Sequence, residues 1–247
     1  MSAQSTTTLT LFGLKKGNWR WGLAQMGILP PRLKTVPGLT FYKLMGSGKG
    51  RVFSLTPDFL LYGLFAVWES EQAADTFFEA SPLLQEYGQH CHEQWTVKLI
   101  PIKAHGLWDG SNPFKAIEHN IQNNGPIAVL TRASIHLKAL PAFWKHGKET
   151  SRAIEKAPGL LAAIGLGELP FVRQATFSIW ESQAQMLEYA YKTAQHQRVI
   201  KKTRSDNWYS EELFARFAIL SATGTWKGKD PLNNISSQIN SNPLAAI

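Results

Sequence analysis

The hexamer FSIWES, at Phe177–Ser182, has a near copy much earlier in the same chain. FAVWES runs from Phe65 to Ser70, and four of its six residues are identical to those of the later copy. Self-similarity at a fixed distance is the signature of an internally repeated architecture. Two copies of one structural unit are therefore expected within the 247 residues.

The similarity continues on both sides of the hexamer, and the matching segments follow in the same order. Before the hexamer, PGLTFYKLMGSGKG (Pro37–Gly50) is matched by PGLLAAIGLGE (Pro158–Glu168). After it, GLWDGSNPF (Gly106–Phe114) is matched by GTWKGKDPL (Gly224–Leu232). The openings TLTLFGL (Thr8–Leu14) and PIAVLTRASI (Pro126–Ile135) pair more weakly. Matches that keep one order along the chain argue against chance similarity of Trp-Glu-Ser alone.

These matches divide the chain into an N-terminal half at 8–116 and a C-terminal half at 126–232. The polar stretch IEHNIQNNG (Ile117–Gly125) joins the halves, and the tail at 233–247 is polar with little periodicity. We expect the two halves to meet near residues 117–125. We expect the tail to be weakly ordered or draped on the surface.

Each half is predicted to run strand, helix, strand, strand, helix, strand, which is the ferredoxin-like pattern of an α+β fold. Ser70 and Ser182 stand where helix N-caps belong, directly after the two Trp-Glu-Ser copies. One such unit exposes an apolar sheet face, so two fused units are expected to bury these faces against each other. The predicted helices include 31–34 and 71–80 in the first half and 139–157 and 183–203 in the second, and the closing strands are 95–104 and 213–222.

The composition is that of a globular chain with a basic surface. Hydrophobic residues make up 44% and aromatic residues 11%, and the lone Cys91 excludes an intrachain disulfide. No secretory signal is evident, and apolar stretches such as Phe59–Trp68 are too short to span a bilayer, which predicts a soluble or peripheral protein. The net charge of +8 favours anionic partners, namely lipid headgroups, an acidic redox protein or nucleic acid, or reflects only a solvated surface.

Familiar catalytic signatures are mostly absent from the sequence. GSGKG (Gly46–Gly50) lacks the flanks of a phosphate-binding loop and is interpreted as a turn between helix and strand. The run His90-Cys91-His92 is more typical of an exposed helix end than of a metal site.

His196 is the histidine that the pattern singles out. In the helix predicted after FSIWES, Met186, Tyr189 and Ile200 fall at spacings that define one apolar stripe, and His196 lies on the same stripe. An inward imidazole is either a hydrogen-bonded core histidine or an axial ligand to a haem packed between helix and sheet. The matching position in the first half is Leu84, so a single asymmetric site is consistent with the repeat. The basic run RVIKKTR (Arg198–Arg204) beyond it is a solvated helix end or a contact for propionates, lipid or an acidic electron donor.

The chain resembles the spheroidene monooxygenases, which place a keto group at C-2 of acyclic carotenoids. The resemblance covers about 11–231, and the stretches that carry it are WGLAQMG (Trp21–Gly27), SNPF after WDG, AVLTRASI, IGLGELPFVRQATFSIW (Ile164–Trp180) and HQRVIKKTRSDNWYSEELFARFAIL (His196–Leu220). The resemblance implies a dimeric α/β-barrel-like architecture within one chain. It also implies haem b, with iron held by His196, because several haem enzymes of that wider group carry their iron ligand on this helix.

The resemblance further implies a site and a set of partners. Met186, Tyr189 and Ile200 would line the haem, and Arg132 would stand on the oxygen side or meet a propionate. The partners would be an apolar carotenoid, O2 and a ferredoxin-type electron donor, with no nucleic acid. We expect a cytoplasmic protein, peripheral on the inner face of the membrane, whose attachment to anionic lipid weakens with salt.

Two alternatives to a haem-dependent carotenoid monooxygenase are also consistent with the sequence. The first is another haem enzyme on the same fold, a dehydratase or a peroxide-using catalyst with a different apolar substrate, since a fold does not fix a reaction. The second is a cofactor-free binding module for an apolar ligand or nucleic acid.

Overall fold

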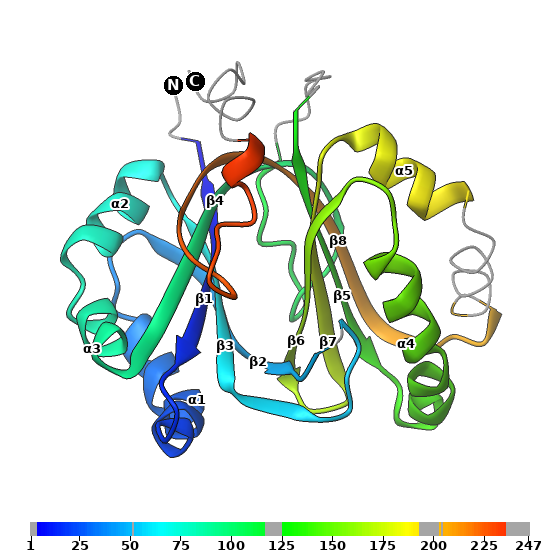
Figure 1. The fold of residues 1–247 in the computed structure, drawn as a ribbon, viewed down its shortest axis with the longest axis horizontal. Coiled ribbons are helices and arrows are strands. Elements are labelled where there is room, and N and C mark those ends of the chain that lie inside the picture. Colours follow the sequence, from blue (N-terminus) through cyan, green and yellow to red (C-terminus); the bar gives the residue numbers. More distant parts are fainter. Residues whose placement is uncertain (1–3, 51, 117–124, 193–202, 204, 236–247) are drawn as a thin grey trace.

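The computed structural model describes residues 4–50, 52–116, 125–192, 203 and 205–235. Within these residues eight antiparallel strands close into one barrel, and helices lie on two opposite sides of it (Figure 1). None of the helices in the described part is long and apolar enough to cross a bilayer.

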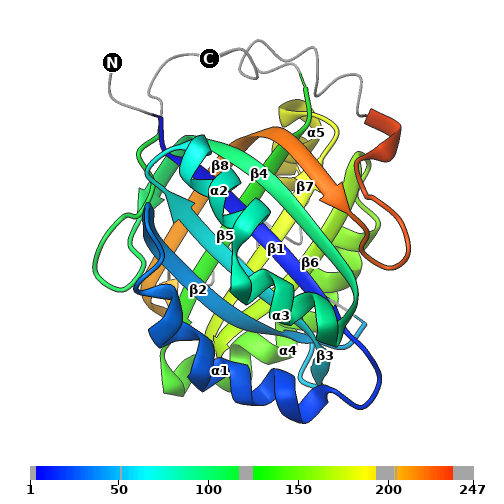
Figure 2. The ribbon, with the colours of Figure 1, turned by 90° about the vertical axis from the view of Figure 1, so that its left-hand side faces the viewer.

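The first half contributes four strands and the helices of one side. Figure 2 shows α1, α2 and α3 lying across the outer face of these strands. The elements are β1 (Thr6–Leu14), α1 (Trp19–Leu33), β2 (Leu39–Gly48), β3 (Pro57–Trp68), α2 (Glu71–Ala80), α3 (Pro82–His90) and β4 (Cys91–Gly106).

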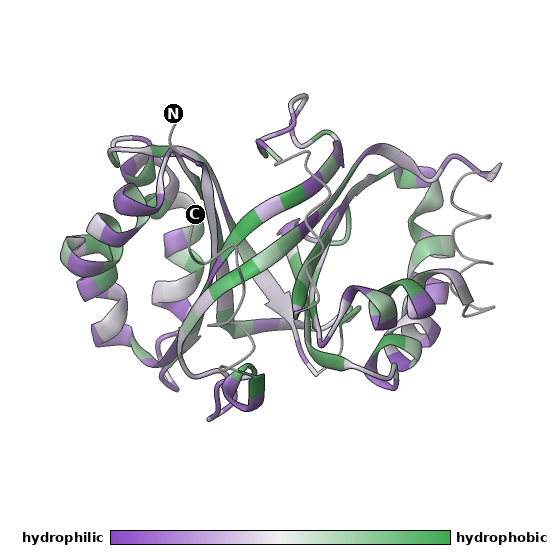
Figure 3. Cartoon of the chain, turned by 90° about the horizontal axis from the view of Figure 1, so that it is seen from above, coloured by the Kyte–Doolittle hydropathy of each residue, from purple (hydrophilic) through white to green (hydrophobic). Residues whose placement is uncertain are grey.

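The second half repeats the strand pattern on the other side of the barrel. From above, its helices and those of the first half flank the barrel on opposite sides (Figure 3). The elements are β5 (Ile127–Ile135), a 3-10 turn (Leu137–Ala139), α4 (Leu140–Glu155), β6 (Leu160–Leu169), β7 (Arg173–Trp180), α5 (Gln183–Lys192) and β8 (Tyr209–Gly224).

The barrel has the strand order β1-β3-β2-β6-β7-β5-β8-β4, so the halves are hydrogen-bonded to each other along two seams. The β4–β8 seam is long, running from Trp95 opposite Gly224 to Gly106 opposite Leu213. The β2–β6 seam is short. The predicted face-to-face sheets thus also join at their edges and enclose a single interior, filled by apolar side chains from both halves. The α+β fold with two fused ferredoxin-like repeats is confirmed.

The two Trp-Glu-Ser copies occupy equivalent strand-to-helix corners. Trp68 pairs with Thr6 of β1, and Trp180 pairs with Ile127 of β5. Each serine caps the helix that follows: the Ser70 hydroxyl accepts from the N–H of Ala73 at 3.2 Å, and the Ser182 hydroxyl accepts from that of Gln185 at 3.3 Å. The repeated hexamer therefore marks one corner used twice, with both N-caps as predicted.

Several elements differ from the sequence-based expectation. The first helix begins at Trp19, so the predicted segment 31–34 is only its end. The helix after FAVWES is broken at Ser81 into α2 and α3, and Leu84 lies in α3. GSGKG ends a strand and turns towards β3, and so does not link a helix to a strand.

The tail is anchored at its start. Asn233–Ile235 forms a 3-10 turn, and Ile235 is 7% exposed within the barrel core. The expectation of a draped tail therefore does not hold for these three residues. The rest of the tail, 236–247, lies outside the described residues.

Two matching loops clasp the halves together, one from each half. The N–H groups of Asp109 and Gly110 donate to the Glu211 carboxylate of β8 at 3.0 and 2.7 Å. In the other copy the N–H groups of Lys227 and Gly228 donate to Glu93 of β4. Asp109 and Lys227 both have positive φ, which turns two successive N–H groups towards one anion. The repeated Trp-x-Gly motifs are thus reciprocal carboxylate clamps between the halves.

Candidate functional site

The second half presents two faces with different chemistry, and strand alternation assigns residues to each. On β5, Ala128 and Leu130 point into the barrel interior, while Ile127 and Val129 point outward towards α4 and α5. By the same alternation Arg132 belongs to the interior face. Thr131 belongs to the outer face.

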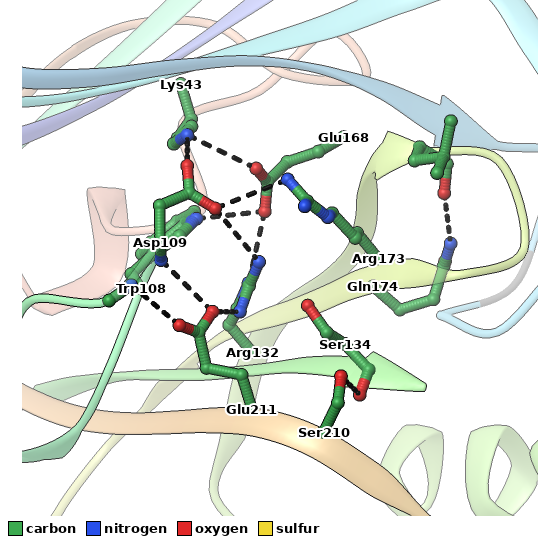
Figure 4. A network of polar contacts seen from close by, with 12 residues as sticks. Lys43, Trp108, Asp109, Arg132, Ser134, Glu168, Arg173, Gln174, Ser210 and Glu211 are labelled. Carbon is green, nitrogen blue, oxygen red and sulfur yellow. Dashed lines mark hydrogen bonds and ion pairs between the residues drawn. The ribbon is translucent and has the colours of Figure 1, made fainter. Parts of the chain in front are cut away.

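The interior face carries a network of charged side chains around Arg132 (Figure 4). The Arg132 side chain is fully buried, with its Nε donating to Glu168 at 3.1 Å and its Nη1 donating to Glu211. Lys43 reaches Asp109 and the Oε2 of Glu168, and the Trp108 indole N–H donates at 2.9 Å to the Glu168 Oε1 that also accepts from Arg132. With Arg173 at 3.3 Å from Asp109, three cations face three carboxylates.

This network stabilises the ionised state of its carboxylates. Burial alone would raise the pKa of Glu211, but hydrogen bonds from the N–H groups of Gly110 and Asp109 and from Arg132 lower it overall. Burial also acts against the charge of Asp109, and Lys43 with the two arginines lowers its pKa overall. The network is therefore a structural element that joins β2, β5, β6 and β8 to the Trp108 loop.

We expect acid to weaken the fold through these carboxylates. Because their pKa is lower in the folded than in the unfolded protein, their stabilisation is complete above the unfolded pKa of about 4 and is lost as pH falls through the folded pKa. Glu211→Gln should therefore lose less melting temperature than the parent between about pH 6 and about pH 3. Thermal melts across this range measure it, and parallel curves for both proteins would contradict the assignment.

The outer layer of the first half is one continuous apolar core. Helices α1, α2 and α3 pack on the sheet through a single cluster of buried residues. In the second half the described residues of the same layer form separate clusters, one around α5 and the end of α4, and one at the start of α4. Among the described residues the two layers are therefore packed differently although their backbones repeat.

The strand registers show where the second layer has lost volume. Phe12 pairs with Tyr62 on the first sheet, and the equivalent pair on the second is Ala133 with Gln174. Likewise Leu44 pairs with Leu64 where the second half has Gly165 with Thr176. At these two pairs, large apolar side chains on the outer face of the first sheet correspond to smaller or polar ones on the second.

The centre of β5 is open to solvent. Thr131 is exposed, although it sits mid-strand on the face that the helices cover. Its repeat partner Thr10 is fully buried and shares a hydrogen bond of 3.0 Å with Thr96. Where the first half has Thr96, the second has the half-buried Phe214, opposite Thr131. The centre of β5 is therefore more exposed on its helix-facing side than the equivalent position of β1.

One edge of this layer is closed by a segment from the other half. The β2–β3 connection lays Val52 over β6, and a Cβ on Gly165 would lie 1.6 Å from the Val52 carbonyl oxygen. The next residue, Phe53, donates its N–H to Ser151 of α4 at 2.9 Å and contacts the Phe143 ring. Glycine is thus required at 165 for this crossing. The first half thereby supplies part of the second half's cover.

A charged side chain lies on the same outer face. Arg216 of β8 pairs with Val129, is half-buried, and has its guanidinium carbon 5.8 Å from the centre of the Phe214 ring. Its Nε is buried and has no hydrogen-bond partner among the described residues. Sequence analysis did not select it, because FARFAIL reads as an ordinary buried strand. Thr131 was also missed.

The structure separates the residues predicted from the sequence. Met186 and Tyr189 are residues of α5 in the outer layer: Met186 is buried, and the Tyr189 ring lies 5.2 Å from the Trp180 ring. Burial raises the pKa of the Tyr189 hydroxyl to about 12. Arg132 lies on the opposite, interior face of the sheet, so these residues are not brought together. His196 and Ile200 lie outside the described residues.

The other histidines are distributed around the molecule. His105 of β4 lies on the edge of the second half's outer face, 5.2 Å from Phe214, and His146 of α4 stacks on Trp208. On the first half, His90 stacks on Trp21 and the His92 ring contacts the Leu14 carbonyl at 3.0 Å. No group of three or more metal-ligating side chains occurs among the residues described.

The outer layer of the second half has three features that suit a large apolar cofactor with charged groups. It combines reduced side-chain volume, an exposed strand centre and a buried guanidinium nitrogen without a partner. An orphaned buried donor costs free energy unless a ligand satisfies it. These residues are compatible with a haem between sheet and helices.

Solved structures with this arrangement include two aldoxime dehydratases. One, crystallised with butyraldoxime, has a TM-score of 0.54 and 9% identity over 87% of this chain and 79% of that one. The other has a TM-score of 0.54 and 8% identity over 87% and 81%. At this identity the likeness concerns the fold alone. No protein-family model matches the chain.

Sequence comparison gives a more specific result. The chain is 37% identical to the spheroidene monooxygenase of Cereibacter sphaeroides over 92% of its length and 70% of the relative's. It is 40% identical to that of Rubrivivax gelatinosus over 85% and 80%, and 34% identical to that of Rhodobacter capsulatus over 86% and 88%. The chain therefore belongs to the spheroidene monooxygenase family and is an oxygen-dependent oxidoreductase.

Proposed function

We propose that this chain is a haem-dependent monooxygenase that oxidises C-2 of an acyclic carotenoid to a ketone, in the manner of spheroidene to spheroidenone. The observation that carries the proposal is the identity of 34–40% over most of the chain with three proteins named spheroidene monooxygenase. The incompletely packed outer layer of the second half supports it as a place for cofactor and substrate.

The proposed reaction consists of two hydroxylations at one carbon. In each, one atom of O2 enters a C–H bond, and two electrons and two protons convert the other atom to water. The second hydroxylation gives a gem-diol, which loses water to leave the ketone. Haem b would supply the activation of O2.

The chain's own residues would hold the cofactor and exclude water. His196 is proposed as the axial ligand, with Met186, Tyr189 and Ile200 on the same stripe lining the ring. The buried Met186 and Trp180 keep water from this side of α5. Arg132 stays a prediction as an oxygen-side residue, and its described contacts assign it to the interior network.

The electrons are proposed to come from a reduced ferredoxin-type donor. An acidic donor would be attracted by the net charge of +8. Anionic lipid would be attracted in the same way, and a peripheral position on a membrane would bring the enzyme to its substrate.

The proposal is tested by the absorption spectrum of the purified protein, followed by turnover of an acyclic carotenoid with O2 and reduced ferredoxin. We expect a Soret band and formation of a C-2 ketone. A Soret band with turnover only of an aldoxime or a peroxide would indicate another haem enzyme on this fold. No Soret band after haem addition would favour a cofactor-free binding module.

We predict that Thr131→Phe weakens haem binding about tenfold while leaving the fold intact. Thr131 is exposed, so a larger side chain meets no packed neighbour in the ligand-free protein, but it occupies the space above the strand. Haem titration with thermal melts measures both effects. Thr131→Ser keeps the space open and serves as the control. Unchanged haem affinity in Thr131→Phe would place the cofactor elsewhere.

A further inference from the structure

Arg216, a cation on the outer face of the second half, has a counterpart in the first half, Lys98. Lys98 of β4 pairs with Thr8 of β1, and Arg216 of β8 pairs with Val129 of β5, so the two cations hold the same position in their repeats. Both project from the outer face of their sheet towards the helix that follows Trp-Glu-Ser.

In the first half this cation is neutralised within the protein. Lys98 is hydrogen-bonded to Asp75 of α2, and Glu71 of the same helix lies 3.7 Å away. Glu71 follows the capping Ser70 directly, and Asp75 lies one helical turn further on. Their counterparts in α5 are found by the same count from the capping Ser182.

In the second half the acids are missing. Counted from Ser182, Glu71 corresponds to Gln183 and Asp75 to Leu187. The equivalence of the two helices is supported by the ring pairs Trp68–Phe77 and Trp180–Tyr189, at 5.0 and 5.2 Å. The cation has therefore been kept while both of its counter-charges were replaced by uncharged side chains.

A second positive charge lies beside Arg216. Lys103 is directly opposite it on β4, whereas Lys98 faces the uncharged Ser221 on β8. Like charges directly opposite on neighbouring strands are destabilising. Neither Arg216 nor Lys103 forms an ion pair within the described part of the chain, and burial lowers the pKa of the Arg216 guanidinium. The guanidinium nevertheless stays charged at neutral pH.

We infer that Arg216, with Lys103 beside it, binds carboxylate groups of the ligand in the second half's outer layer, specifically the propionates of the haem. A carotenoid hydrocarbon carries no anion, so the cofactor is the ligand that this pair of charges fits. The inference rests on the proposed haem function. It assigns Arg216 a binding role that leaves the iron ligand unspecified.

Ligand-free protein is titrated with haem and, separately, with haem dimethyl ester, and binding is measured through the Soret band. The ester has the same ring but no propionate charge. We expect the parent to bind haem about tenfold more tightly than the ester. Arg216→Gln should lose most of this preference, since only Lys103 then remains, while Arg216→Lys should retain most of it.

Two further variants use the repeat as an internal control. Lys98→Gln removes the neutralised counterpart and should leave the affinities for haem and ester unchanged. Gln183→Glu introduces an acid at the position equivalent to Glu71, which faces Lys98 in the first half, and should weaken binding of haem more than that of the ester. Thermal melts show whether each variant is folded. If Arg216→Gln does not fold, the preference of Arg216→Lys for haem over the ester still tests the inference.

The outcomes distinguish this inference from the function on which it rests. Binding of neither porphyrin by the parent would overturn both. Tight haem binding by the parent with the same preference over the ester in Arg216→Gln would overturn the carboxylate site alone. Equal loss of haem and ester affinity in Arg216→Gln would also overturn it, because the residue would then serve the ring or the packing.

Discussion

His196→Ala is expected to lower haem affinity by more than about a hundredfold, since loss of a residue that merely supports a metal ligand already costs about 10–100-fold. His196 lies outside the described residues, so the expectation rests on its sequence spacing from Met186 and Tyr189. Both are residues of α5 and pack in the second half's outer layer. If His196 is the ligand, removing its imidazole would delete the iron–nitrogen bond and leave that layer, so the variant should still fold.

Haem titration alongside thermal melts separates the ligand from a core histidine. A ligand variant should lose the parental Soret band and recover part of it with added imidazole. A core histidine would instead lower the melting temperature with haem content per folded molecule unchanged. If the spectrum is unchanged, the remaining histidines become the candidates: His90, His92, His105, His119, His136 and His146. His105 would be tested first, because it lies beside Phe214 on the outer layer.

Arg132→Leu is expected to lower the free energy of unfolding by about 3–5 kcal/mol, because it leaves Glu168 and Glu211 without their buried counter-charge. The Arg132 side chain is fully shielded from solvent and contacts both carboxylates. For a chain of this size the change corresponds to a drop in melting temperature of about 6–20 °C. Denaturant and thermal unfolding measure it.

Arg173→Ala is the matched control for Arg132→Leu. Arg173 reaches the same network through Asp109, but its side chain is 43% exposed, so its loss should cost less than about 1 kcal/mol. Adding Glu211→Gln to Arg132→Leu should recover part of the lost stability, since it removes one unpaired charge. Equal effects of the two arginine variants would show that the network is not a buried element.

The sequence predicted the repeat and the fold well because turns, caps and patterning agree in both copies. Trp68 and Trp180 fall at equivalent corners, and Ser70 and Ser182 cap the helices as predicted. The start of α1 was missed although Asn18, a residue type that favours N-caps, stands directly before it. Two prolines inside the helix interrupt its pattern, and only the basic C-terminal end was assigned as helix.

The candidate site was predictable only in part. The apolar stripe of α5 follows from helical spacing, and Met186 and Tyr189 do pack in the outer layer. The face occupied by Arg132 could not be assigned from an alternating strand alone, because alternation defines two faces without saying which one the barrel encloses. Arg216 becomes conspicuous only when the register places it opposite Val129 and Lys103.

The different packing of the two helical layers has a consequence for the protein's local opening. A continuous apolar cluster holds the first half's helices, whereas among the described residues α4 and α5 contact separate clusters, one of which includes Val52 from the other half. Segments with fewer buried apolar contacts open at lower free energy. Without ligand, α5 should therefore exchange its amide hydrogens and be cleaved by protease before α2, and a ligand bound there would protect it. The first half would then stay folded while α5 of the second half opens, and binding of the ligand would stabilise α5.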